Sequence, residues 1–400
     1  MTCPAPTPSA LSDVKVDAAG VVAFTQALVR TPSVNDPVHG RSEQTAATLV
    51  AEQMRAFGWD PVIAGAALGR PNVVATIEGG GGDGPTLLFE GHTDVVTEGP
   101  RAEWTVDPFG AEIRDGRLYG RGAADMKSGV AAMLYGTRAL QLAGPFPGRI
   151  VVAALADEEG LMIGVHDFVD SGQADGVDAA IVCEPEGGEI CPVSKGAIRI
   201  RVDFHGRMAH GAMPQHGRNP LPVAAAFINR LAELERELQE RYGEHEHLGL
   251  PYVTPTVVTG GDLDQINVIP ALATVAADVR TVPGIDHAML ITRVREIAAP
   301  AEVSVLVDRL PVDTPADHPV VAALAVAHRT VTGEEPRYGG VPGTTDGTIL
   351  TARGGVPTVV YGPGGKWIAH QADEYVEVAE IIRYARVYAE AARLFLAGQP

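Results

Sequence analysis

The sequence predicts an α/β protein in which a smaller α+β domain is inserted into a larger domain. The chain has 400 residues, which is long enough for two domains of ordinary size. Short apolar runs alternate with amphipathic stretches over most of its length, a pattern typical of a sheet covered by helices. One segment breaks this alternation. We therefore place the first part of the larger domain at 1–194, the insertion at 195–309 and the second part at 310–400.

Helices and strands of the larger domain follow from hydrophobic spacing. Residues 17–30 and 43–58 carry apolar side chains three and four positions apart, which predicts two amphipathic helices. Residues 72–77 and 86–90 are apolar runs that predict strands. The stretch GGGGDG between them lacks the Lys-Ser/Thr ending and the following helix of a phosphate-binding loop. We therefore expect it to connect a hairpin.

The insertion has its own order of elements. Strands are predicted in KGAIRIRVDFHG, ATVAADVRTVP and EVSVLVD, and helices in NPLPVAAAFINRLAELERELQERY and IDHAMLITRVREIA. Together they make a β-α-β-β-α-β-like pattern of a small α+β domain. The chain then returns to the larger domain with HPVVAALAVAHRTVTG, which predicts a helix.

Composition argues against several classes of partner. Thirty-one Lys and Arg against fifty Asp and Glu leave a net charge of -19, which repels phosphate backbones and anionic lipids. No segment reaches the roughly 18 apolar residues of a membrane span, and the N-terminal stretch lacks the regions of a secretory signal. We expect neither nucleic acid nor membrane as a partner, and a cytoplasmic location. Cys3, Cys183 and Cys191 show no CxxC spacing, so neither a disulfide framework nor a thiolate zinc site is predicted.

The first candidate site residues stand where an apolar run ends. LLFEGHTDVV places His92 and Asp94 two positions apart, so a strand would present both on one face. His92 could equally be a satisfied buried histidine. Asp125 falls in a Gly-rich turn before a helix predicted to begin near Lys127. There it could be a metal ligand or a helix N-cap.

Three further strand ends carry acids or a histidine. IVVAALADEEG ends in Asp157, Glu158 and Glu159, whose mutual repulsion a bound cation would relieve. Glu184 ends AAIVCEPEG, and His370 lies in a loop after a fourth strand. Because the carboxyl ends of strands in an open α/β sheet form one edge, these positions jointly predict a metal site. Two imidazoles with several carboxylates and no thiolate suit zinc, cobalt or manganese, with enough acids for two ions.

Five ordered motifs carry a resemblance to a known family: GHTDVV, GRGAADMKSGVAAML, ALADEEG, IVCEPEG and AHQADEYV. The chain resembles the metal-dependent aminoacylase and exopeptidase family that contains acetylornithine deacetylase, succinyl-diaminopimelate desuccinylase, aminoacylase and glutamate carboxypeptidase. The resemblance implies a zinc-exopeptidase-like catalytic domain that binds two divalent ions, most simply Zn²⁺, with Co²⁺ or Mn²⁺ as alternatives. It also implies that the insertion is a ferredoxin-like lid that forms the interface of a homodimer.

The same resemblance implies a role for each motif residue. His92 and Glu184 would bind one ion, Glu159 and His370 the other, and Asp125 would bridge them. Two further carboxylates are implied to support the chemistry: Asp94 by orienting His92, and Glu158 as the general base.

Residues of the insertion are implied to contact the substrate. HGRMAHGAMP is similar to a lid motif in which His210 donates to the developing oxyanion, commonly across the dimer, with His205 and His216 as nearby alternatives. The remaining candidates for substrate binding are Arg280, Asn267, Thr344 and Thr345. An Arg fork suits a substrate carboxylate, but Arg280 could instead pair structurally with Asp278.

The implied activity is hydrolysis of the amide of an N-acyl amino acid, of deacetylase or desuccinylase type, in amino-acid metabolism. A metal-activated water would attack, with Glu158 as base. Two alternatives remain: a dipeptidase or carboxypeptidase acting on short peptides with the same scaffold, and a non-catalytic homologue that binds amino-acid-like ligands. The free Glu158 argues against the second, because a binding protein needs no base beside a metal ligand. Closure of the lid over the cleft is a further expectation.

Overall fold

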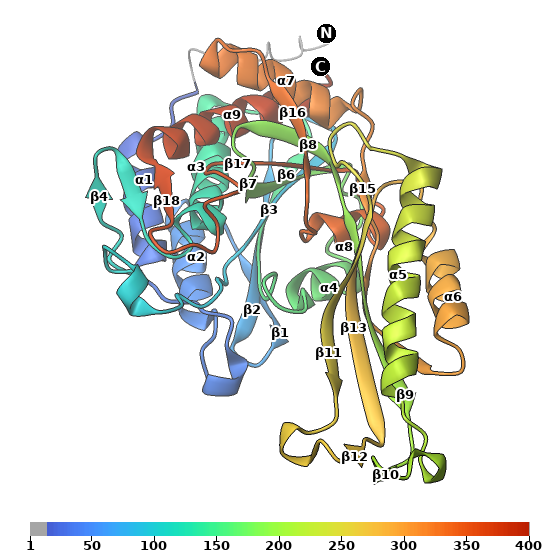
Figure 1. Cartoon of the computed structure of the whole chain (residues 1–400). Helices are drawn as coiled ribbons and strands as arrows, with labels where there is room; N and C mark the ends of the chain where they lie inside the picture. The colour runs from blue at the N-terminus through green and yellow to red at the C-terminus, as the bar shows by residue number, and fades with distance from the viewer. Residues whose placement is uncertain (1–13, 400) are drawn as a thin grey trace. The chain divides into compact units, whose positions relative to one another are not determined.

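The computed structural model describes residues 14–399 (Figure 1). Cys3 and the N-terminal stretch that lacks the regions of a secretory signal lie outside these residues. Among the described residues, Cys183 and Cys191 are free and buried. No helix in this part of the chain is long and apolar enough to cross a membrane.

The chain forms two compact units. The first contains the residues up to Pro192, together with Thr314–Gly340 and the residues from Thr345 onward. The second contains Val193–Asp313 and Val341–Thr344. The assignment of a catalytic and a lid role to these parts stays a prediction.

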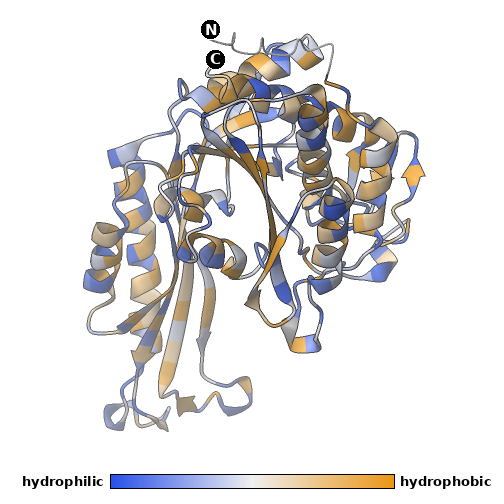
Figure 2. Ribbon diagram, turned by 180° about the vertical axis from the view of Figure 1, so that it is seen from behind, coloured by the Kyte–Doolittle hydropathy of each residue, from blue (hydrophilic) through white to orange (hydrophobic). Residues whose placement is uncertain are grey.

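A mixed sheet forms the centre of the first unit, in the order β1-β2-β6-β3-β7-β17-β8. Its strands are β1 (Val62–Ala67), β2 (Arg70–Glu78), β3 (Thr86–His92), β6 (Arg149–Leu155), β7 (Ala179–Pro185), β8 (Glu189–Ser194) and β17 (Thr358–Gly362), and β15 (Val312–Asp313) and β16 (Arg337–Val341) also pair with β8. The four strands β6, β3, β7 and β17 are parallel neighbours. Every residue of β3, β7 and β17 is buried, as expected for parallel strands covered on both faces, and Figure 2 shows their hydrophobic colouring.

Helices cover this sheet, and the first unit also contains a small three-stranded sheet. The helices are α1 (Ala18–Val29), α2 (Gln44–Ala56), α3 (Ser128–Ala143), α4 (Ile163–Asp170), α7 (Pro319–Thr332), α8 (Gly347–Ala352) and α9 (Val378–Leu396), with short turns η2 (Pro37–His39), η3 (Arg101–Glu103) and η4 (Ala123–Lys127). The small sheet contains β4 (Ile113–Arg114), β5 (Arg117–Tyr119) and β18 (Tyr375–Glu377). The helices predicted at 17–30, at 43–58 and near Lys127 are confirmed.

The predicted hairpin around GGGGDG is wrong. β6 lies between β2 and β3, antiparallel to the first and parallel to the second. The glycines instead allow the segment before β6 to approach the Gly-rich loop closely. The N–H of Gly79 donates to the carbonyl of Gly148 (2.9 Å), and a Cβ on Gly79 would lie 2.0 Å from the carbonyl oxygen of Phe146.

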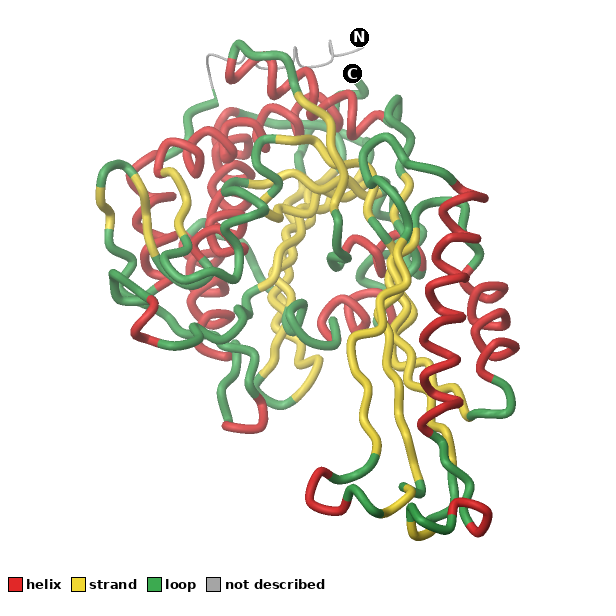
Figure 3. Tube along the Cα trace, viewed as in Figure 1, coloured by secondary structure: helices red, strands yellow, loops and turns green. Residues whose placement is uncertain are grey.

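The second unit has the strand order β11-β13-β9-β14, with all neighbours antiparallel. Figure 3 shows its long strands in yellow beside its helices in red. Its elements in chain order are β9 (Gly196–His205), β10 (Ala209–His210), η5 (Pro214–His216), α5 (Leu221–Tyr242), β11 (Tyr252–Gly260), η6 (Leu263–Gln265), β12 (Val268–Ile269), β13 (Leu272–Thr281), α6 (His287–Ala298) and β14 (Glu302–Arg309). This order and the β-α-β-β-α-β sequence are ferredoxin-like. The sequence did not single out β11, whose Pro255 is tolerated because β11 is an edge strand.

Substitution of Phe89 tests the packing of the large sheet. It is fully buried in β3, and its ring centroid lies 5.3 Å from that of Tyr388 in α9. Phe89→Ala is expected to lower the free energy of unfolding by about 3–5 kcal/mol, because a cavity is added to the lost burial. Urea denaturation measures this. The control Leu142→Ala removes a side chain that is 66% exposed and should change stability by less than about 0.5 kcal/mol. Equal effects of the two substitutions would contradict the packing.

Candidate metal centre

Four neighbouring strands of the first unit bring polar side chains to one edge of the sheet. β3 ends in its histidine, two glutamates follow β6, one glutamate lies near the end of β7, and the loop after β17 carries the second histidine. Asp125 comes from η4, the turn before α3. Because the four strands are parallel, their carboxyl ends meet at the same edge. The residues brought together in this way are His92, Asp125, Glu158, Glu159, Glu184 and His370.

Asp125 lies between the two histidines. Its Oδ1 is 3.1 Å from Nε2 of His92, and its Oδ2 is 3.2 Å from Nε2 of His370. Nε2 of His92 also lies 3.2 Å from Oε1 of Glu184, and Nε2 of His370 lies 2.9 Å from Oε1 of Glu159. The result is two groups of donors, each with one imidazole and one carboxylate of its own, that share Asp125. This donor set fits two divalent ions bridged by a carboxylate.

Glu158 lies beside the group of His92 and Glu184. One ligand atom from each of these three residues lies within 4.8 Å of the other two. Although the residue is only partly buried, the surrounding protein desolvates its carboxyl group and raises the pKa of Glu158 well above its usual range. The charge on His92 opposes this rise, and the charges on Glu184 and Glu159 add to it. A carboxyl group with a raised pKa suits proton transfer near neutral pH.

The carboxylate of Asp94 lies closer to the backbone of Glu158 and Glu159 than to the imidazole of His92. Nδ1 of His92 is 3.0 Å from the carbonyl oxygen of Asp94 and 3.4 Å from its Oδ1. The two carboxylate oxygens accept the N–H groups of Glu158 and Glu159, both at 3.1 Å. One buried carboxylate thus connects the end of β3 to the turn after β6.

Glu374 supports Asp125 and the loop of His370. Its Oε1 accepts the N–H groups of Ala124 (2.9 Å) and Asp125 (3.0 Å), and its Oε2 is paired with the guanidinium of Arg121. Arg121 also donates to the carbonyl of His370 (3.2 Å). Desolvation raises the pKa of Glu374 to about 7, and the nearby Arg121 opposes the rise. A buried ion pair therefore connects the turn before α3 to the loop after β17.

The proposed substrate-binding residues lie mainly in the second unit. His210 pairs with Val268 in the ribbon of β10 and β12, next to Asn267, whose carbonyl accepts the N–H of Gly211 (2.6 Å). Arg280 donates to Asp278 (2.6 Å), which is the structural alternative considered from the sequence. Thr344 accepts from the guanidinium of Arg309 (3.2 Å). Thr345 belongs to the first unit and is buried, with Oγ1 accepting the N–H of Gly347 (3.2 Å).

Sequence reasoning missed the residues that surround the candidate ligands: Asn35, Arg70, Arg121 and Glu374. No periodicity or spacing marks them, because their partners lie tens to hundreds of positions away. Asp157 also behaves differently from the expectation that a bound cation relieves all three adjacent acids. It is paired with the buried guanidinium of Arg70, so of the three acids only Glu158 and Glu159 belong to the groups around the two histidines.

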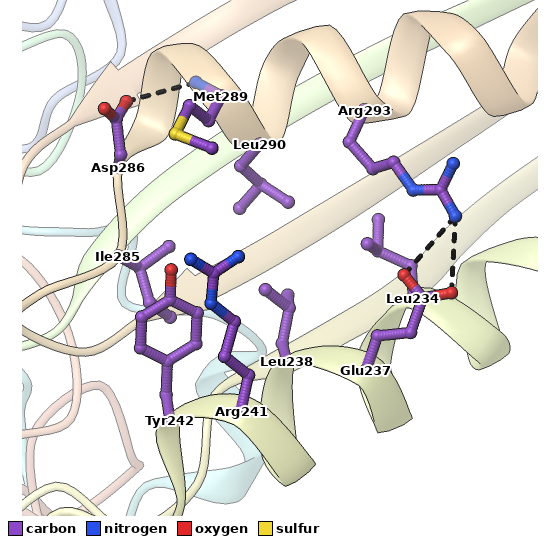
Figure 4. Close-up of a pocket in the computed structure, with 10 residues that line it drawn as sticks. All are labelled: Leu234, Glu237, Leu238, Arg241, Tyr242, Ile285, Asp286, Met289, Leu290 and Arg293. Carbon is purple, nitrogen blue, oxygen red and sulfur yellow. Dashed lines mark hydrogen bonds and ion pairs between the residues drawn. The ribbon is translucent and has the colours of Figure 1, made fainter.

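A separate hollow lies between α5 and α6 within the second unit (Figure 4). Its walls are mostly apolar, and its charged groups are engaged locally. Arg293 donates to Glu237 (3.3 Å), and Asp286 caps α6 by accepting the N–H of Met289 (3.1 Å). None of its lining residues belongs to the motifs described above, so this hollow is not the candidate site.

Similarity to one protein family extends over most of the chain. Residues 88–394 match the model described as "Peptidase family M20/M25/M40". A succinyl-diaminopimelate desuccinylase from Methylorubrum populi is 32% identical over 92% of this chain and 96% of its own. An M20-family metallo-carboxypeptidase from Sulfolobus solfataricus has a TM-score of 0.79 at 21% identity, over 94% of this chain and 99% of its own. A dinuclear metal-binding peptidase of the M20 family from Bacillus subtilis has a TM-score of 0.72 at 17% identity, over 95% and 98%. These structures confirm the predicted α/β fold class.

Substitution of Glu374 tests whether this residue holds the candidate metal ligands in place. Glu374→Gln removes the charge that faces Arg121 and weakens acceptance of the N–H of Asp125. We expect the affinity for zinc to fall by about 10- to 100-fold, as for other groups that orient metal ligands. Titration of the metal-free protein against a chelator of known affinity measures this. In the control Glu377→Gln, the substituted side chain is 41% exposed and paired with Arg117, so affinity should be unchanged. An unchanged affinity in both variants would contradict the role of Glu374.

Proposed function

The chain belongs to peptidase family M20/M25/M40, and on that premise we propose that it hydrolyses the amide bond of an N-acyl amino acid. The family resemblance carried by the five motifs is thereby confirmed, and the chain is a metallohydrolase. The observation that carries the proposal is Asp125, shared by two imidazole–carboxylate pairs with Glu158 beside them. The similarity to proteins named succinyl-diaminopimelate desuccinylase favours an acylated amino acid as the substrate, and succinyl as the acyl group.

We propose that the site holds two divalent ions, most simply zinc. His92 and Glu184 would bind one, His370 and Glu159 the other, and Asp125 both. When bound, such ions polarise the scissile carbonyl and make the attacking water more acidic. The donor chemistry supports zinc because imidazole nitrogen and carboxylate oxygen are ligands it commonly takes, and cobalt and manganese accept the same set.

We propose that Glu158 moves the proton. It takes a proton from water as the water oxygen bonds to the carbonyl carbon, and it then gives that proton to the amide nitrogen as the C–N bond breaks. The products are a carboxylate and a free amino acid. Two features support this role: the carboxyl group is desolvated, and its backbone N–H is held by Asp94.

Residues of the second unit are proposed to recognise the substrate. His210 would donate to the oxyanion that develops on the carbonyl oxygen. Asn267 and Arg280 would bind a carbonyl and a carboxylate of the substrate, and Arg280 would then exchange its pairing with Asp278 for a bidentate contact. Thr344 and Thr345 would line the same pocket. Each of these assignments is a proposal that rests on the motif resemblance.

We also propose a homodimer formed through the second unit. Within the described residues, β11 pairs only with β13, so its other edge is free. Val257 and Val258 on this strand are 48% and 62% exposed. A free edge with exposed apolar side chains favours pairing with a second chain. The cytoplasmic location stays a prediction.

A panel of substrates tests the proposed function. N-succinyl-diaminopimelate, N-acetylornithine, other N-acetyl amino acids and dipeptides would be assayed with zinc, cobalt or manganese. We expect hydrolysis of an N-acyl amino acid, with the released amine measured directly. Hydrolysis of dipeptides alone would favour the peptidase alternative. A protein that binds two ions and hydrolyses none of the panel would support the non-catalytic alternative.

Glu158→Ala tests the base. We expect kcat to fall by about 100- to 10,000-fold, because proton transfer by a positioned carboxylate contributes that much. Metal content, measured by mass spectrometry, should stay near that of the unsubstituted protein. Glu52→Ala, on the exposed side of α2, is the matched control and should retain full activity. An active Glu158→Ala protein would refute the assignment.

Mixed dimers test whether His210 acts in the partner's site. His210→Ala and Glu158→Ala chains would be co-expressed with different affinity tags, and the mixed dimer isolated. If His210 acts across the interface, one site in each mixed dimer contains both intact residues, and hydrolysis should exceed that of either parent dimer. Mixed dimers no more active than the parents would place His210 in its own site or outside the mechanism.

A further inference from the structure

A network of buried and partly buried side chains lies behind the turn that carries Glu158 and Glu159. Nδ2 of Asn35 donates to Oδ2 of Asp94 and to Oδ1 of Asp157, both at 2.8 Å. Oδ1 of Asn35 accepts from the guanidinium of Arg70 (2.8 Å), which is also paired with Asp157. One amide side chain therefore links the carboxylate that follows β3 to the carboxylate that follows β6.

Asp157 holds the turn itself in shape. Its φ is +68°, in the left-handed region that few residues other than glycine adopt. Its Oδ2 accepts the N–H groups of Leu161 (3.1 Å) and Ile163 (3.3 Å), while Oδ1 faces Asn35 and Arg70. Strained backbone of this kind persists only where the surrounding structure holds it in place. The carboxylate of Asp157 and its partners do this.

Gly160 lets the turn lie directly against the network. A Cβ at this position would come within 2.5 Å of Oδ1 of Asp157 and 2.9 Å of Nδ2 of Asn35. A side chain at position 160 would therefore displace Asn35 or Asp157.

The charges of the network argue against a third metal ion here. Glu43, Asp94 and Asp157 approach one another closely enough to hold a cation. However, Arg70 is 6% exposed, is paired with Asp157, and has NH1 3.6 Å from Oε1 of Glu43. The guanidinium is therefore the cation of this cluster. A metal ion would have to displace it.

We propose that Asn35 and Arg70 are positioning residues for the hydrolytic reaction. Asp94 already holds the N–H groups of Glu158 and Glu159, and Asn35 fixes Asp94 against Asp157 at the start of the same turn. Arg70 orients the amide of Asn35 and neutralises Asp157. Together they set where the base and the Glu159 ligand stand. This inference rests on the proposed function, because it takes Glu158 as the base.

Three variants test the proposal: Asn35→Ala, Arg70→Lys and the double variant. Asn35→Ala removes both donations from a side chain that is only partly buried, so the protein is expected to fold. Arg70→Lys keeps the charge but loses the planar fork that contacts Asn35 and Asp157 together. The matched control is Gln141→Ala, which removes an amide that accepts from Trp59 (2.9 Å) and Arg138 (2.6 Å) away from the site.

The expected result is a fall in kcat of about 10- to 100-fold for each single variant, with KM changed by less than about threefold. Zinc affinity, measured by chelator competition without substrate, should weaken by about tenfold, because Glu159 shares the turn. The kcat of the double variant should be no lower than that of the less active single variant, since both residues act through one turn. Gln141→Ala should keep kcat and zinc affinity.

A purely structural role would lower the melting temperature and leave kcat unchanged below it, and that outcome would overturn the proposal. Additive losses in the double variant would also overturn it. Failure of the proposed function has a different signature, since the unsubstituted protein would then hydrolyse none of the amides. In that case the zinc affinity of Asn35→Ala still tests whether Asn35 positions Glu159. An affinity equal to that of the unsubstituted protein would reject the positioning role.

Discussion

Repulsion among buried carboxylates is the constraint on which the site of this protein depends. The carboxyl edge of the large sheet gathers acids from four strands, and each charge there needs a partner in a medium of low polarity. Some of these carboxylates have a guanidinium or N–H groups of the protein as partners. Arg70 faces Asp157, Arg121 faces Glu374, and three N–H donors face Asp94. The acids that remain beside the two histidines are the ones that fit divalent ions.

The division between compensated and uncompensated acids explains how neighbouring residues differ in role. Asp157, Glu158 and Glu159 are consecutive, yet they face a guanidinium, the edge of the ligand groups and His370 respectively. The left-handed backbone at Asp157 turns the chain so that the three side chains diverge. A regular strand would place the first and third on one face. The turn therefore separates a structural acid, a proposed base and a proposed ligand.

The parallel strands supply the rigid frame for this arrangement. β6, β3, β7 and β17 are fully or almost fully buried, and their register aligns their ends. Side chains on such strands are held more closely than side chains on loops. His370 and Asp125 come from less regular segments, and the pair of Arg121 and Glu374 connects those two segments to each other. A two-ion site needs this precision because catalysis loses rate quickly when groups are misplaced.

The sequence by itself determined the class of the fold and marked the candidate site residues at the strand ends. His92, Asp125, Glu159, Glu184 and His370 could be recognised because each stands next to an apolar run or a Gly-rich turn, and such signals are local. Only the tertiary structure decided strand order. The loop GGGGDG, expected to connect a hairpin, instead joins β2 to β3 with β6 lying between them. It also decided which partner each acid has. Asn35 lies 122 positions from Asp157, and Glu374 lies 249 positions from Asp125. Hydrogen bonds over such separations depend on how the strands assemble, and a single sequence carries no periodic signal for that assembly.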